Sequence, residues 1–116
     1  MTTTVSRIVV AEDDPDLRAV YETWLRERSE SAVTVPDGDR AIEALSDSTA
    51  VLICDRDMPG RRGSEVIRAI ADTDAATIVV SARPPDETLA AADVTEYLVK
   101  PVTRAEFDRA IDRHLQ

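Results

Sequence analysis

The sequence predicts an α/β fold, a doubly wound five-stranded parallel sheet with helices on both faces. Short apolar runs rich in β-branched residues recur along the chain, and segments with helical apolar spacing lie between them. Runs that are apolar at consecutive positions are typical of strands buried on both faces. Because strands and helices alternate over short connections, the strands are expected to run parallel. The predicted strands are Ile8–Val10, Ala32–Val35, Val51–Cys54, Thr77–Val80 and Tyr97–Val99.

Two helix starts carry capping signals. Asp14 is a good N-cap, and Pro15 after it suits the first helical position. Thr103, with Glu106 three residues later, has the pattern of a capping box. Further helices are predicted around 41–45, 66–70 and 86–92. The apolar stripes predicted behind the two caps are Leu17, Val20, Tyr21, Trp24 and Leu25 in the first helix, and Phe107, Ala110, Ile111 and Leu115 in the last.

Length, charge and composition narrow the class of protein. A chain of 116 residues has the size of one domain, so residues 1–116 are predicted to form a single unit. The net charge of −9 argues against direct contact with nucleic acid, because phosphate binding needs a positive surface. No apolar run approaches the roughly 20 residues that span a bilayer, so we expect a cytoplasmic protein without membrane contact. The single Cys54 fits a reducing compartment and is expected to be buried.

Lys100 is the only lysine, whereas the chain has thirteen arginines. Lysine is a compact point charge on a flexible stem, and arginine is a broad planar fork. A tight site that needs one small cation would explain why position 100 differs from every other basic position.

Polar side chains follow the predicted strands at the edge of the sheet where function gathers in this architecture. Glu12 and Asp13 follow the first strand, Asp55 the third, Ser81 the fourth and Lys100 the fifth. If the first and third strands are neighbours, their acids share one pocket, where carboxylates about 4 Å apart repel by roughly 4 kcal/mol at an effective dielectric constant near 20. Hard oxygen ligands without His or Cys suit Mg²⁺. An ordinary acidic helix start is the alternative for the first of these segments.

Four motifs, in order, resemble those of response-regulator receiver domains: VVAEDDPDLR, LICDRDMPGRRG, VVSA and YLVKP. The resemblance covers the whole chain and implies a flavodoxin-like (βα)5 fold. It implies that Asp55 is a phosphoacceptor that takes a phosphoryl group from a histidine kinase. It also implies a cis peptide bond between Lys100 and Pro101.

The same resemblance assigns roles to the residues around Asp55. Mg²⁺ is expected on Glu12, Asp13, Asp55 and the backbone carbonyl of Asp57. Lys100 is expected to pair with Asp55 and then with the phosphoryl oxygens. Ser81 and Tyr97 are expected to form a switch that changes the surface around helix 4, strand 5 and helix 5, through which a homodimer could form. The expected role is a signalling phosphoacceptor that catalyses only its own phosphorylation and dephosphorylation, with a connection to transcription regulation.

One modulating contact and two alternatives complete the predictions. An ion pair between Asp57 and Arg83 is hypothesised to cover the phosphoryl group and tune its hydrolysis. The first alternative is a pseudo-receiver, a binding module that is never phosphorylated. The second is a phosphatase with an aspartyl nucleophile, which the spacing of Asp55 and Asp57 fits superficially.

Overall fold

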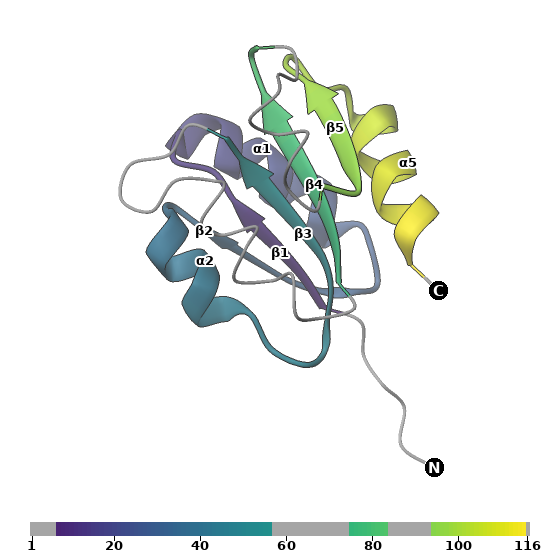
Figure 1. Ribbon diagram of the computed structural model, residues 1–116. Helices are drawn as coiled ribbons and strands as arrows, with labels where there is room; N and C mark the ends of the chain where they lie inside the picture. Colours follow the sequence, from purple (N-terminus) through teal and green to yellow (C-terminus); the bar gives the residue numbers. More distant parts are fainter. Residues whose placement is uncertain (1–6, 57–74, 84–93, 116) are drawn as a thin grey trace.

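The computed structural model describes residues 7–56, 75–83 and 94–115. It contains a five-stranded parallel sheet with the strand order β2-β1-β3-β4-β5 (Figure 1), which confirms the predicted fold class. Each predicted strand lies within an observed one, whereas the helices predicted around 66–70 and 86–92 fall outside the described residues. The strands are β1 (Arg7–Ala11), β2 (Ser31–Val35), β3 (Thr49–Asp55), β4 (Ala76–Ser81) and β5 (Glu96–Val99), and the helices are α1 (Pro15–Arg26), α2 (Gly38–Ala44) and α5 (Arg104–His114).

The sheet separates two apolar layers because successive residues of a strand point to opposite faces. Helices α1 and α5 cover one face and α2 covers the other (Figure 1). The strand residues on the α1 and α5 side include Ile8, Val10, Val51, Ile53, Ile78 and Val80, and those on the α2 side include Val9, Ala11, Val35, Leu52 and Cys54. Among the described residues, no helix is long and apolar enough to cross a membrane.

Both predicted helix caps are present. The Asp14 side chain accepts a hydrogen bond from the Asp16 amide at 2.9 Å, and Thr103 and Glu106 form the reciprocal capping box.

The prediction that Val20 belongs to the apolar stripe of α1 is wrong, because Val20 is 40% exposed. At about 100° per residue, Val20 lies at the opposite margin of the stripe from the buried Leu25, so both cannot face the sheet fully.

Aromatic side chains join α1 to α5. The rings of Tyr21 and Phe107 stack with centroids 5.1 Å apart, and Trp24 packs against Phe107 at 5.2 Å. Tyr21 and Phe107 are each 1% exposed. This contact holds the two helices together on one side of the sheet.

An ion-pair network lies beside this aromatic contact. Arg28, just beyond the end of α1, is within 3.2 Å of Asp108, 2.5 Å of Asp112 and 2.7 Å of Glu30. Arg104 adds contacts to Glu27 and Asp108. Burial opposes the charge of Arg28, but its hydrogen bonds to the three carboxylates outweigh this and raise the pKa of the guanidinium above its usual value.

Candidate functional site

The strand order brings the ends of β1 and β3 together. In the parallel pairing of these strands Ala11 is opposite Cys54, so the next residues, Glu12 and Asp55, lie side by side at the carboxyl edge of the sheet. This edge is the topological switch point of a doubly wound sheet, because the chain passes from β1 to β2 on one side and then crosses back from β2 to β3 on the other side of β1. The prediction that the first and third strands are neighbours is confirmed.

Glu12, Asp13 and Asp55 form a cluster that could hold a metal ion. Each of the three contributes a carboxylate oxygen, and these oxygens lie within 4.8 Å of one another. Glu12 is 1% exposed and Asp55 is 7% exposed, so two of the acids are nearly removed from water. Burial raises the pKa of Glu12 to about 7, and the neighbouring Asp55 acts in the same direction. The cluster therefore strongly favours a cation beside it.

Lys100 supplies one such cation. Its Nζ atom lies 2.9 Å from Asp55 Oδ2 and 3.0 Å from Glu12 Oε1, so a single ammonium group bridges the two buried carboxylates. Burial opposes its charge, but the hydrogen bonds to Asp55 and Glu12 outweigh this and raise the pKa of the amine above its usual value. The backbone fixes this position, because the Lys100 amide donates to the Ser81 carbonyl at 2.8 Å. The expected cis peptide bond between Lys100 and Pro101 is confirmed.

The donor set of the cluster suits Mg²⁺. All three candidate ligands are carboxylates, and a hard ion of this kind takes one or two protein carboxylates and keeps several waters. Cys54, although adjacent, is not suited to binding a metal. It is fully buried, burial raises the pKa of its thiol to about 12, and its Sγ atom donates to the Asp55 carbonyl at 3.4 Å.

The ends of β4 and β5 carry Ser81 and Tyr97. Ser81 is 1% exposed, and its Oγ accepts a hydrogen bond from the Arg83 amide at 3.1 Å. The Tyr97 hydroxyl donates to the Arg83 carbonyl at 2.5 Å, while its ring packs in part against Val79. The backbone of Arg83 therefore contacts both residues of the predicted switch.

The structure thus brings together the predicted acids and Lys100, and it places Ser81 at the adjoining strand end. Asp57 lies outside the described residues, and with it the predicted carbonyl ligand and the hypothesised ion pair with Arg83. Sequence reasoning missed Arg18, whose Nη1 atom donates to the Glu12 carbonyl at 2.8 Å. Its position in the first turn of a helix that starts beside the acids was the available signal.

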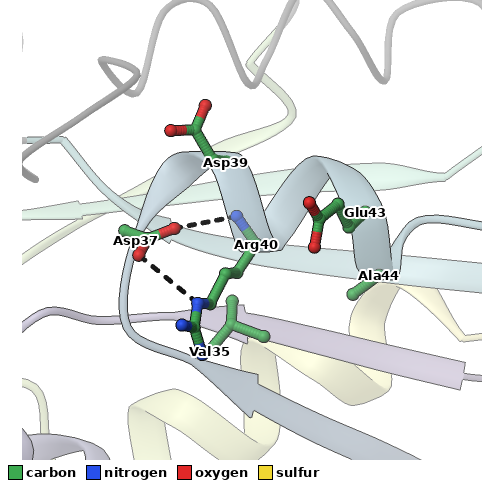
Figure 2. Close-up of a pocket in the computed structure, with 6 residues that line it drawn as sticks. All are labelled: Val35, Asp37, Asp39, Arg40, Glu43 and Ala44. Atoms are coloured by element: carbon green, nitrogen blue, oxygen red, sulfur yellow. Dashed lines mark hydrogen bonds and ion pairs between the residues drawn. The ribbon is translucent and has the colours of Figure 1, made fainter.

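A pocket lies beside α2 (Figure 2). It is lined by Val35, Asp37, Asp39, Arg40, Glu43 and Ala44. Asp37 is the N-cap of α2 and accepts from the Arg40 amide at 2.8 Å, so part of its polar lining serves the helix start. None of the predicted site residues lines this pocket.

Curated relatives match most of this chain. Residues 8–112 match the sequence model of the response regulator receiver domain. The transcriptional regulatory protein PrrA of Mycobacterium tuberculosis is 33% identical over 89% of this chain, and YrkP of Bacillus subtilis, named an uncharacterized transcriptional regulatory protein, is 31% identical over 95%. A putative transcriptional regulator of Haloferax volcanii is 29% identical over 93%. The chain spans 47% of PrrA, 49% of YrkP and 19% of the Haloferax protein.

Solved structures of a response regulator and of a receiver domain match almost the whole chain. Response regulator TrrA of Thermotoga maritima, in complex with Mg(2+)-BeF, is 27% identical with a TM-score of 0.82, covering 96% of this chain and 100% of that one. The receiver domain of a sensor histidine kinase from Pseudomonas aeruginosa, with a magnesium ion coordinated in its active site cleft, is 25% identical with the same TM-score, covering 95% of this chain and 97% of that one. With the sheet order, the acidic cluster and the bridging lysine, these matches show that the chain belongs to the response regulator receiver domain family.

Proposed function

We propose that this domain accepts a phosphoryl group on Asp55 from a histidine kinase, with Mg²⁺ bound beside it. The observation that carries the proposal is the bridge from Lys100 Nζ to Asp55 Oδ2 and Glu12 Oε1, at 2.9 and 3.0 Å, next to an acidic cluster that suits a divalent ion. Receiver domains as a family work with histidine kinases in two-component signalling, which supports the choice of donor.

The proposed reaction is a direct transfer. An oxygen of the Asp55 carboxylate attacks the phosphorus atom of a phosphohistidine, a P–O bond forms, and the P–N bond to the donor breaks. The main obstacle is repulsion between the anionic acceptor and the anionic phosphoryl group, so catalysis consists of positioning and charge compensation. The Lys100 ammonium group places a positive charge beside the Asp55 carboxylate. After transfer it would move toward the phosphoryl oxygens, because the added negative charge lies on them.

The metal site in the proposal consists of Glu12, Asp13, Asp55 and the backbone carbonyl of Asp57, which lies outside the described residues. Bound Mg²⁺ would neutralise charge on the acidic cluster and on the phosphoryl oxygens. The described acids fit such an ion because their oxygens lie within 4.8 Å of one another.

The proposed switch uses Ser81 and Tyr97. Phosphorylation changes the charge at Asp55 from about −1 to about −2 and adds acceptor oxygens. Ser81 would turn its hydroxyl toward them, which releases the hydrogen bond from the Arg83 amide. The Arg83 carbonyl accepts a hydrogen bond from Tyr97, so a change at Ser81 would be passed on to Tyr97 on β5. In this proposal the surface that responds consists of β5, α5 and helix 4, the helix predicted around 86–92, outside the described residues. Arg83 could also modulate hydrolysis through Asp57.

The wider role is proposed from the relatives. Several are named transcriptional regulatory proteins, and this chain spans about half of their length or less. We propose a cytoplasmic signalling domain, not an enzyme acting on other substrates, that controls transcription through other parts of such a protein and forms a homodimer through helix 4, β5 and α5. Direct contact with nucleic acid or membrane is not part of the proposed role.

The test is incubation with acetyl phosphate and Mg²⁺, followed by measurement of the intact mass. The expected result is the gain of one phosphoryl group by the wild type and none by Asp55→Asn or by wild type with EDTA. A wild type that stays unmodified, while a purified receiver domain of known activity is modified beside it, contradicts the proposal and favours a pseudo-receiver. Continuous turnover of a phosphate ester that depends on Asp55 would instead favour a phosphatase.

A further inference from the structure

Glu12 is held by hydrogen bonds at four atoms. Its amide donates to the Val35 carbonyl at 3.0 Å, which extends the pairing of β1 with β2 by one residue. Its two carboxylate oxygens accept from Lys100 Nζ at 3.0 Å and from the Asp14 amide at 3.1 Å. The fourth contact is the 2.8 Å hydrogen bond that its carbonyl accepts from Arg18 Nη1.

The contact from Arg18 acts on more than Glu12. The Glu12 carbonyl and the Asp13 amide belong to one rigid, planar peptide unit. When Arg18 holds the carbonyl oxygen, it also fixes the direction in which the chain enters Asp13. The pairing of β1 with β2 reaches as far as the Glu12 amide, so the peptide unit between Glu12 and Asp13 lies just beyond the sheet ladder, and α1 begins only at Pro15. Arg18 therefore spans the turn between the strand and the helix.

We propose that Arg18 is a positioning residue for the metal-binding acids and that its hydrogen bond to Glu12 raises the affinity of the site for Mg²⁺. The inference rests on the proposed function, because it assumes that Glu12 and Asp13 act as metal ligands. Groups that hold the ligands of a metal commonly change its affinity by 10- to 100-fold when they are removed.

Charge alone predicts the opposite change in Mg²⁺ affinity when Arg18 is removed. Arg18 is a cation near the acidic cluster, so removing it should make the site more attractive to Mg²⁺ if electrostatics dominated. Positioning predicts weaker binding after the same substitution. The direction of the change in affinity therefore separates the two effects.

The experiment is calorimetric titration of the metal-free protein with MgCl₂. Arg18→Met keeps the aliphatic stem and removes the donors, and it is expected to weaken Mg²⁺ binding by about tenfold. Arg18→Lys keeps one donor group and the charge, so it should recover most of this affinity. Arg26→Ala is the matched control, because it removes an exposed arginine from the last turn of the same helix, and it should bind Mg²⁺ as tightly as the wild type or slightly more tightly.

Circular dichroism of each metal-free variant tests whether it is folded. If Arg18→Met is unfolded, Arg18→Gln replaces it, because the shorter glutamine side chain should not reach the Glu12 carbonyl. Binding by Arg18→Met or Arg18→Gln as tight as in the wild type, or tighter, overturns the positioning role and leaves the proposed function standing. A wild type without saturable Mg²⁺ binding overturns the proposed function and this inference together.

Discussion

The hydroxyl of Tyr97 donates a hydrogen bond to the backbone carbonyl of Arg83, 2.5 Å away. The amide of the same residue donates to Ser81 Oγ at 3.1 Å. A side chain at the edge strand β5 is thus connected, through one residue of backbone, to a buried hydroxyl at the end of β4. In this structure Arg83 therefore links the two residues of the proposed switch through its amide and its carbonyl.

Removal of the Tyr97 hydroxyl should loosen the Arg83 backbone. A hydrogen bond of this type contributes about 1 kcal/mol, so Tyr97→Phe is expected to speed hydrogen exchange of the Arg83 amide by about fivefold. The measurement is amide exchange by NMR in the unphosphorylated protein. Tyr21→Phe is the control, since Tyr21 lies in the core between α1 and α5 and should leave Arg83 unchanged. Equal Arg83 exchange in the wild type and Tyr97→Phe would show that this hydrogen bond does not hold the segment.

The hydroxyl of Tyr21 is expected to cost stability. Tyr21 is 1% exposed, and among the described residues its oxygen has no hydrogen-bond partner. Burial raises the pKa of this phenol to about 12. A buried polar group without a partner costs about 1–3 kcal/mol, so Tyr21→Phe should increase the free energy of unfolding by about 1 kcal/mol in urea titrations. A loss of stability would mean that the hydroxyl is satisfied, for example by a buried water.

Lys100 should matter through the size of its cation as well as its charge. Lys100→Met leaves two buried carboxylates facing each other, and phosphorylation by acetyl phosphate should slow by at least about 100-fold. Mg²⁺ affinity in the same variant should be equal or higher, because a cation that competes for Asp55 and Glu12 is gone. Both quantities are measured on one preparation, by intact mass over time and by calorimetry.

Lys100→Arg tests the geometric part of this argument. It restores a positive charge as a planar fork, which does not fit a position 2.9 and 3.0 Å from two oxygens in the way that a compact ammonium does. The phosphorylation rate should stay closer to that of Lys100→Met than to that of the wild type. A rate equal to the wild type would show that charge alone is sufficient and would remove the explanation offered for the single lysine.

The sheet and most of the described site followed from local patterns. Most strands contain a continuous apolar run. Asp55 and Ser81 are the last residues of β3 and β4, and Glu12 and Lys100 directly follow β1 and β5, so a parallel sheet with β1 next to β3 brings Glu12, Asp55 and Lys100 to one edge. The arginine contacts did not follow, because the chain has thirteen arginines and their long side chains reach partners that no spacing rule identifies. Arg18 contacts a carbonyl six residues earlier, and Arg28 contacts carboxylates eighty and more residues later. Val20 was misassigned because it lies at the edge of the apolar face of the helix. Whether such a residue is buried depends on the elements that pack against the helix, which the sequence pattern does not specify.

The two arginines at the junction of α1 and α5 should differ in their effect on stability. The Arg28 side chain is 12% exposed and contacts three carboxylates, whereas the Arg104 side chain is 46% exposed and contacts Glu27 and Asp108. Arg28→Met should lower the free energy of unfolding by about 2 kcal/mol, between the values typical of exposed and buried pairs, and Arg104→Met should lower it by much less, because exposed ion pairs contribute little. Exposed pairs are screened by salt and buried ones much less, so in 1 M KCl the Arg104 effect should vanish while most of the Arg28 effect persists. Urea titrations at low and high KCl measure both, and equal losses for the two variants would contradict the assignment of Arg28 as the centre of the network.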